Sequence, residues 1–261
     1  MLCILDMDGV LYRGKYVFPQ TLPTLRWLRE NHHRLVFMTN NGTRTRSEYV
    51  KRIKEIGIKV SDDDVMTSAY AAGVYLKKKR GKKIIVAGEK GLEKELRRAG
   101  VKIVDWQKPG QVDYVVAGMD LAFSYEKLSR CQQAILDGAE FIATNTDNTW
   151  PGEDRLYPGA GAMIAAIEAA TGRKPVLLGK PEPFMLKLVL ETAKIRAKDA
   201  VVVGDRLETD IAGAKPLGIT TVLVLSGVTN LNQVRKAPLN LRPDFIIKNI
   251  DGLKRIIDDL S

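Results

Sequence analysis

The sequence predicts an α/β fold built around a mainly parallel β-sheet. Short, continuous apolar runs recur along the 261-residue chain, and most of them are separated by segments with helical periodicity. Strands of a parallel sheet that is covered on both faces have such continuous runs, whereas half-exposed strands alternate between apolar and polar residues. The alternation of these runs with helices is typical of βαβ units. We therefore expect helices on both faces of the main sheet.

Nine apolar runs are expected to form strands. They lie at 2–5, 34–40, 83–88, 114–119, 140–145, 175–180, 200–205, 220–227 and 244–248. Segments 22–31, 46–57 and 126–138 have apolar residues at helical spacing. They are expected to be connecting helices.

Capping residues predict the ends of two helices. Thr45 followed by Glu48 fits a capping box, and Gly57 fits the stop of the same helix. A helix that begins near Thr209 is expected to end at Pro216 and Gly218, because proline lacks an amide N–H and glycine favours a turn.

Composition excludes several classes of protein. Charged residues make up 28% and hydrophobic residues 45% of the chain, which is ordinary for a globular protein and argues against disorder. No apolar run approaches the roughly 20 residues of a membrane span, and the first residues do not resemble a signal peptide. The chain has only two cysteines, Cys3 and Cys131, both in apolar contexts, which excludes a disulfide framework. We expect a cytoplasmic protein with two buried thiols and no membrane partner.

The formal net charge of +10 admits three explanations. Nucleic-acid binding would require basic residues along one stripe, preferably with aromatic residues between them. Lysine and arginine are scattered instead, and aromatic residues make up only 7%, so we expect no nucleic-acid partner. Steering of anionic substrates and a thermophile-like charged surface are the other two explanations, and they are compatible with each other.

Polar residues follow four of the predicted strands directly. Asp6 and Asp8 come after the first run, Thr39–Asn40–Asn41 after the second, Lys180 after "PVLLG", and Asp205 after "AVVVG", with Asp210 close behind. The carboxyl ends of parallel strands meet at one edge of the sheet, where ligands bind in open α/β folds. We therefore expect these side chains to gather in one crevice.

The carboxylates predict a metal site. Asp6 and Asp8 are two residues apart, so they point the same way if the strand continues. Together with Asp205 they would repel one another unless a divalent cation lay among them. Oxygen ligands without a nearby histidine or cysteine favour Mg²⁺ over zinc.

A second set of groups predicts a site for an anion instead of a metal. It consists of Thr39, the backbone N–H groups that follow it, and Lys180. A loop that leads to a helix N-terminus can bind phosphate through backbone donors, and a metal with a lysine can stabilise charge on a transferred phosphoryl group. A carboxylate in such a site can act as a nucleophile and form an aspartyl-phosphate, while a second carboxylate handles protons. Each motif alone is more often an ordinary turn, cap or loop. Their occurrence after four strands in order favours the functional interpretation.

The motif order "DMDGV", "TNN", "GKP" and "GDRLETDI" resembles the haloacid dehalogenase-like superfamily. The segment "ATNTDNTWPGEDRLYPGAGA" resembles its 4-nitrophenylphosphatase/NagD-like branch. This resemblance covers essentially the whole chain. It implies a Mg²⁺-dependent phosphatase acting on small phosphorylated metabolites, with a Rossmann-like core of three α/β/α layers and an inserted α/β cap.

The resemblance also implies a role for each motif residue. Asp6 would be the nucleophile and a metal ligand, and Asp8 the general acid/base, which contacts the metal through its backbone carbonyl. Asp205 would be the third metal ligand. Asp210 would orient metal-bound water or the loop. The phosphate would be held by Thr39, Asn40 and Asn41, and Lys180 would bridge it to the nucleophile. The resemblance assigns no role to Arg206.

In this branch the cap is inserted between the second and third motifs, which places the core at 1–81 and 175–261 and the cap at 82–174. The basic segment "KKKRGKK" at 77–83 would be the first linker. Asn145, Asp147 and Trp150 would lie in a cap loop that faces the leaving group. Trp150 would either stack on a substrate ring or pack against the cap's own strands. A homodimer contact through the small-residue helix at 159–170 stays an alternative.

Three other functions are alternatives to hydrolysis. A phosphotransferase or mutase of the same superfamily would pass the phosphoryl group to an acceptor other than water. A phospho-accepting signalling module also combines acidic residues with a lysine on a parallel sheet, but would not explain a cap-sized insertion or "TNN". Dinucleotide binding is disfavoured, because no G-x-G-x-x-G follows the first strand.

Overall fold

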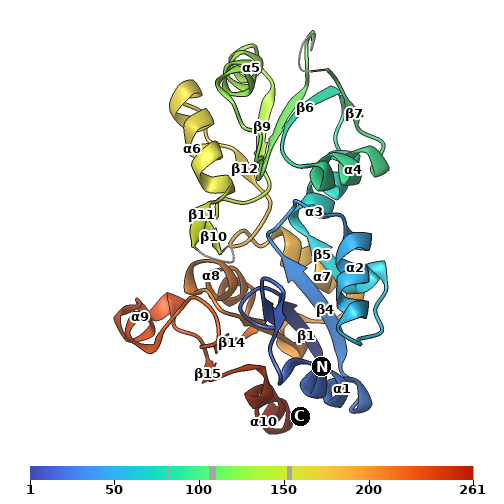
Figure 1. Cartoon of the computed structure of the whole chain (residues 1–261), viewed down its shortest axis with the longest axis vertical. Helices are drawn as coiled ribbons and strands as arrows, with labels where there is room; N and C mark the ends of the chain where they lie inside the picture. Colours follow the sequence, from blue (N-terminus) through green and yellow to red (C-terminus); the bar gives the residue numbers. More distant parts are fainter. Residues whose placement is uncertain (82, 106–109, 152–154, 261) are drawn as a thin grey trace. The chain divides into compact units, whose positions relative to one another are not determined.

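The computed structural model describes residues 1–81, 83–105, 110–151 and 155–260. Within these ranges the chain forms two units (Figure 1). The first unit comprises Met1–Thr39, Tyr49–Met66 and Lys180–Ser261, and the second comprises Asn40–Glu48 and Thr67–Gly179.

Six strands form the sheet of the first unit. They are β1 (Leu2–Asp6), β4 (Arg34–Thr39), β5 (Val65–Thr67), β13 (Ala200–Gly204), β14 (Thr220–Val224) and β15 (Phe245–Ile247). Their order in the sheet is β15-β14-β13-β1-β4-β5, and β1 pairs in parallel with both β13 and β4. The first strand of the sequence thus lies inside the sheet, and every one of its side chains is buried.

The remaining elements of the first unit connect these strands or cover them. They are β2 (Tyr12–Arg13), β3 (Tyr16–Val17), α1 (Thr21–Glu30), α2 (Arg46–Glu55), η1 (Asp62–Asp64), α7 (Phe184–Ala193), η2 (Ala197–Asp199), η3 (Leu207–Ile211), α8 (Ala212–Ala214), η4 (Lys215–Leu217), α9 (Leu231–Lys236), η5 (Leu239–Leu241), η6 (Ile250–Gly252) and α10 (Leu253–Leu260). Of α2, the first unit includes the part from Tyr49 onward. Apolar side chains of α1, α2 and α10 pack with alternate residues of β1, β4, β13 and β14 in one core. Leu223 of β14 packs with η3 and α9 in another.

The second unit has a sheet of its own. Its strands are β6 (Lys83–Ala87), β7 (Lys102–Ile103), β8 (Tyr114–Ala117), β9 (Glu140–Ala143) and β12 (Val176–Leu177), in the order β12-β9-β8-β6-β7, and all four strand pairs are parallel. Its helices are α3 (Ser68–Lys77), α4 (Lys90–Arg98), α5 (Tyr125–Leu136) and α6 (Ala160–Thr171), and a hairpin joins β10 (Thr149–Pro151) to β11 (Leu156–Pro158). Residues of α5 and α6 share one core with β6, β8 and β9.

These two parallel sheets confirm the predicted α/β fold. The capping box at Thr45 and Glu48 is also present: the amide of Thr45 donates to Glu48, and the amide of Glu48 donates back to the Thr45 hydroxyl. The helix expected from near Thr209 is instead three short turns, η3, α8 and η4, with Gly218 at φ +70° after the last. No helix among the described residues is long and apolar enough to span a bilayer.

The boundaries of the two units differ from those of the predicted core and cap. The segment Asn40–Glu48 and helix α3 belong to the second unit, whereas the prediction placed both in the core. Close packing explains α3: a Cβ on Gly73 would lie 3.1 Å from the Cβ of Ala99, so the helix lies tightly against the end of α4. Lys82, the first residue of the predicted cap, lies outside the described residues. The assignment of 82–174 as a substrate-specificity cap stays a prediction.

Candidate active site

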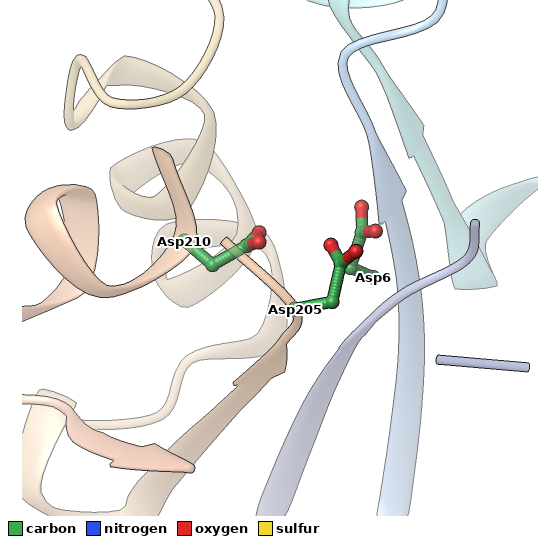
Figure 2. A group of neighbouring side chains, drawn as sticks. All are labelled: Asp6, Asp205 and Asp210. Carbon is green, nitrogen blue, oxygen red and sulfur yellow. The ribbon is translucent and has the colours of Figure 1, made fainter. Parts of the chain in front are cut away.

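Two aspartates reach the same edge of the first unit's sheet from neighbouring strands. Asp6 is the last residue of β1, and Asp205 directly follows β13. The strands are parallel with Leu5 opposite Val203, so their carboxyl ends coincide. Figure 2 shows the carboxyl groups of Asp6 and Asp205 side by side, with that of Asp210 directed toward them. The sheet topology therefore brings together residues that are almost 200 positions apart.

The three carboxylates form one buried cluster. Each offers an oxygen that lies within 4.8 Å of an oxygen of the other two. Asp6 is 9% exposed, Asp205 3% and Asp210 1%, so water solvates none of them well. Ionised carboxylates in such a place require a cation or strong hydrogen bonds.

Lys180 supplies one positive charge to this cluster. Its Nζ lies 2.6 Å from Oδ1 of Asp6 and 2.6 Å from Oδ1 of Asp210, and the residue is only 4% exposed. Three carboxylates against one ammonium leave an excess of two negative charges when all four groups are ionised. The oxygen-only donor set and this excess both fit a divalent hard cation such as Mg²⁺.

The pKa values in the cluster reflect the same imbalance. Burial raises the pKa of Asp6 well above its usual range, and the charges of Asp210 and Asp205 add to the effect of burial against the opposing effect of Lys180. Burial, together with Asp210, raises the pKa of Asp205 to about 6. Burial alone would lower the pKa of Lys180, but the carboxylates of Asp210 and Asp6 outweigh it and raise that pKa. A bound cation would favour the ionised carboxylates.

Asp210 reaches the cluster from a single wide turn. The element η3 is a π-helical turn in which the carbonyl of Arg206 accepts from the amides of Asp210 and Ile211. The amide of Arg206 in turn donates to Oδ2 of Asp210 at 3.2 Å. A Cβ on Gly204 would lie 2.2 Å from the carboxyl carbon of Asp210, so only glycine fits there. The structure thus places Asp210 against Lys180 and gives the backbone of Arg206 a role in holding it.

Asp8 lies beyond the end of β1, where the chain turns. It is half-buried and forms a backbone bridge with Tyr12. The turn depends on Gly9, which has φ +81°, and a Cβ on this residue would lie 2.4 Å from Oδ2 of Asp205. Thr39 ends β4, one residue past the pairing of Asp6 with Met38, so it reaches the same edge of the sheet. It is 4% exposed.

Asn40 and Asn41 belong to the second unit, where they have close partners. The carbonyl of Asn40 accepts from the Ser68 hydroxyl at 2.5 Å and from Nδ2 of Asn145 at 2.9 Å. The side-chain amide of Asn40 donates to both carboxylate oxygens of Asp147, at 3.2 and 3.3 Å. Oδ1 of Asn41 accepts from the amide of Thr43 at 3.0 Å. Asn145 and Asp147, predicted to face the leaving group, thus contact Asn40.

Trp150, the third predicted residue of the cap loop, lies in the hairpin β10–β11. Its ring stacks on that of Tyr157, with centroids 5.2 Å apart and an interplanar angle of 24°, and the residue is 37% exposed. This stack is a contact within the hairpin, and a contact of Trp150 with a substrate ring stays a prediction. Residues 152–154 of the same motif lie outside the described residues.

One group of site residues was missed from the sequence. The segment Ser226–Val228 follows β14 and contacts Asp205: the amide of Val228 donates to Oδ2 of Asp205 at 2.8 Å. The segment closes an apolar run, as the four predicted motifs do, but it offers no carboxylate or lysine. Its contribution comes from backbone groups, which residue types do not reveal.

Comparison with known proteins identifies the family. The profile of the haloacid dehalogenase-like hydrolases matches residues 3–102, and a second, HAD-hydrolase-like profile matches residues 177–253. The ribonucleotide monophosphatase NagD of Escherichia coli is 34% identical over 95% of this chain and 95% of its own length.

Solved structures agree with this match. The 4-nitrophenylphosphatase of Thermotoga maritima is 36% identical, with a TM-score of 0.90 over 97% of this chain and 96% of that one. The glycerol phosphate phosphatase of Mycobacterium tuberculosis, solved in complex with magnesium, is 32% identical, with a TM-score of 0.89 over 97% of this chain and 75% of that one. The chain therefore belongs to the haloacid dehalogenase-like hydrolase family and, within it, to the 4-nitrophenylphosphatase/NagD-like branch of phosphoric monoester hydrolases.

Proposed function

We propose that this protein is a Mg²⁺-dependent phosphatase that hydrolyses small phosphomonoesters through an aspartyl-phosphate on Asp6. The observation that carries the proposal is the buried cluster in which Lys180 contacts Asp6 and Asp210 while Asp205 lies within 4.8 Å of both carboxylates. A nucleophilic carboxylate, an ammonium and an acidic cation site are the parts that phosphoryl transfer requires.

The metal would be held by the carboxylates of Asp6 and Asp205, together with the backbone carbonyl of Asp8. The magnesium complex of the related glycerol phosphate phosphatase supports the choice of cation. When bound, Mg²⁺ would neutralise charge on the phosphoryl group and on the two carboxylates.

Residues of this chain carry out the chemistry in two steps. A carboxylate oxygen of Asp6 attacks phosphorus, and the bond from phosphorus to the leaving oxygen breaks as Asp8 donates a proton to that oxygen. Asp8 then takes a proton from water, whose oxygen attacks the phosphoryl group, releases inorganic phosphate and restores Asp6. Lys180 holds Asp6 in place and, with Thr39, offers positive charge and a hydroxyl to the phosphoryl oxygens. Asn40 and Asn41 are proposed as further phosphate contacts.

The substrate class is a small phosphorylated metabolite. The related proteins are named for ribonucleotide monophosphates, 4-nitrophenyl phosphate and glycerol phosphate, which share a phosphomonoester and differ in the leaving group. A panel of phosphorylated metabolites, assayed for release of inorganic phosphate, would rank sugar phosphates against nucleotides and phosphoglycolate. Addition of an alcohol acceptor to the same assay would reveal transfer to a group other than water.

The test is hydrolysis of 4-nitrophenyl phosphate with Mg²⁺ by the wild-type protein and by Asp6→Asn. We expect activity that EDTA abolishes, and a loss of several orders of magnitude in Asp6→Asn, because an amide cannot form the phosphoenzyme. Asp258→Asn is the matched control, because Asp258 is an exposed aspartate on α10. Folding of each variant is checked by circular dichroism. A folded Asp6→Asn protein with wild-type turnover would exclude the mechanism.

A further inference from the structure

The segment Ser226–Gly227–Val228 lies directly against the carboxylate of Asp205. It leaves the sheet at the end of β14, which pairs in parallel with β13, so it emerges beside Asp205. The amide of Val228 donates to Oδ2 of Asp205 at 2.8 Å, and the amide of Thr229 donates to the Asp205 carbonyl at 3.2 Å. One carboxylate oxygen and the backbone of Asp205 are thus both held by this segment.

Two glycines make this close approach possible. A Cβ on Gly227 would lie 2.0 Å from Oδ2 of Asp205, and a Cβ on Gly9 would lie 2.4 Å from the same oxygen. Gly9 is in the turn after β1, and Gly227 is in the turn after β14. The carboxylate therefore lies between two chain segments that no larger residue would allow so close.

Ser226 connects these two segments. Its hydroxyl donates to the carbonyl of Gly9 at 2.7 Å, and its own carbonyl accepts from the guanidinium of Arg13 at 2.9 Å. The turns that follow β1 and β14 are thereby joined across the position of Asp205. The hydroxyl of Ser226 donates to a backbone carbonyl and not to one of the three carboxylates, so its effect on the site would act through backbone position.

We propose that Ser226 and Gly227 are positioning residues that set the orientation of Asp205 before a divalent cation binds. The proposal rests on the metal site of the proposed function. With Oδ2 held by the amide of Val228, Oδ1 is the oxygen left to face the cation. A metal ligand whose rotamer is already set loses less conformational freedom when the metal binds. In other metal sites, mutation of residues that hold a ligand in place changes metal affinity by about 10–100-fold.

The test measures metal binding without substrate. Mn²⁺ serves as the probe, with the free ion quantified by electron paramagnetic resonance in a titration of the metal-free protein. We expect Ser226→Ala to weaken Mn²⁺ binding about 3–10-fold, because one hydrogen bond is lost. Gly227→Ala should weaken it by at least about tenfold, because the new Cβ displaces the carboxylate. The turnover number at saturating Mg²⁺ should change much less than the dissociation constant for Mn²⁺ does.

Two further variants separate positioning from a general loss of stability. Ser226→Thr keeps the hydroxyl and should keep near wild-type Mn²⁺ affinity. Val228→Ala removes an exposed side chain but keeps the amide that donates to Asp205, so it should also bind Mn²⁺ normally. The melting temperature of each metal-free variant shows how far the fold itself is affected.

The outcomes distinguish this proposal from the one it rests on. If the wild-type protein binds no Mn²⁺ and Mg²⁺ does not raise its melting temperature, the proposed metal site itself is wrong. If the wild-type protein binds Mn²⁺ and both Ser226→Ala and Gly227→Ala bind it equally well, the metal site stands and the positioning role is overturned. A lower melting temperature in these variants with unchanged metal affinity would likewise show a purely structural role.

Discussion

Replacement of Lys180 by methionine tests the electrostatics of the site directly. Methionine keeps most of the volume of the buried stem but removes the ammonium that lies 2.6 Å from both Asp6 and Asp210. The three carboxylates would then lie within 4.8 Å of one another without that ammonium between them. We expect the metal-free variant to be strongly destabilised.

The magnitude follows from the burial of the pair. Lys180 is 4% exposed and Asp210 1%, so the loss of one partner leaves buried charge without compensation, which costs about 3–5 kcal/mol. For a chain of this size each kcal/mol lowers the melting temperature by about 2–4 °C, so a decrease of about 6–20 °C is expected in EDTA. Saturating Mg²⁺ should restore more of the melting temperature in the variant than in the wild-type protein, because a divalent cation replaces the missing charge.

Differential scanning calorimetry in EDTA and in Mg²⁺ measures both effects, and phosphatase assays measure the loss of turnover, expected at about 100-fold or more. Lys215→Met is the matched control. The ammonium of Lys215 lies 2.8 Å from Oδ1 of Asp244, but the two side chains are 27% and 41% exposed. A pair so exposed contributes about 0–1 kcal/mol.

Two results would refute this reasoning. One is a Lys180→Met protein whose melting temperature in EDTA equals that of Lys215→Met, because buried charge would then not determine its stability. The other is a variant that keeps turnover within a few-fold of wild type, which would remove Lys180 from the proposed chemistry.

Three further outcomes are expected. The pKa of Asp205 is raised to about 6 from an ordinary 3.8, so the metal-free folded state binds this proton more tightly than the unfolded chain does. The contribution of Asp205 to the free energy of unfolding should therefore fall as pH rises from about 4 to 6. Urea titrations of the wild-type protein and of Asp205→Asn isolate this contribution as their difference, and a difference with the opposite slope would contradict the raised pKa. Burial raises the pKa of the Cys3 and Cys131 thiols to about 12 and leaves both residues 0% exposed, so Ellman's reagent at pH 8 should react with neither in the native protein and with both in guanidinium. Thr45→Ala removes the hydroxyl that accepts from the amide of Glu48 and should cost about 1–2 kcal/mol in urea unfolding, whereas Thr45→Ser should cost much less.

The fold was predictable because the two patterns that indicate it, continuous apolar runs and helical periodicity, are local in the sequence. Buried parallel strands are apolar on both faces, so β1, β13 and β14 are legible as short continuous runs. The meeting of Asp6 and Asp205 was also predictable, since the carboxyl ends of parallel strands share an edge. The distance between their carboxylate oxygens, 4.8 Å or less, was not predictable, because it depends on the strand order, in which β13 lies next to β1.

The parts that sequence reasoning missed depend on backbone groups and on pairs of distant residues. The contact of Asp147 with Asn40 joins positions 107 residues apart, and neither residue type favours that partner over water. The hydrogen bond from Val228 to Asp205 is donated by a backbone amide, which every residue except proline has, so the residue type does not reveal it. In the wide turn at η3, one carbonyl, that of Arg206, accepts hydrogen bonds from two amides. The spacing of residues in the sequence fits an ordinary α-helix equally well, so it did not reveal this turn.

The strand order also determines when the site can exist during synthesis. Strand β1 leaves the ribosome before both of its neighbours in the sheet; β4 follows soon, but β13 begins only at Ala200. Until then β1 has one open side, and such unpaired edges are prone to aggregate. The lysine and the other two aspartates of the cluster lie at positions 180, 205 and 210, so they emerge within a short interval of one another. The growing chain therefore assembles the acidic cluster and its ammonium together, late and after the second unit has been made.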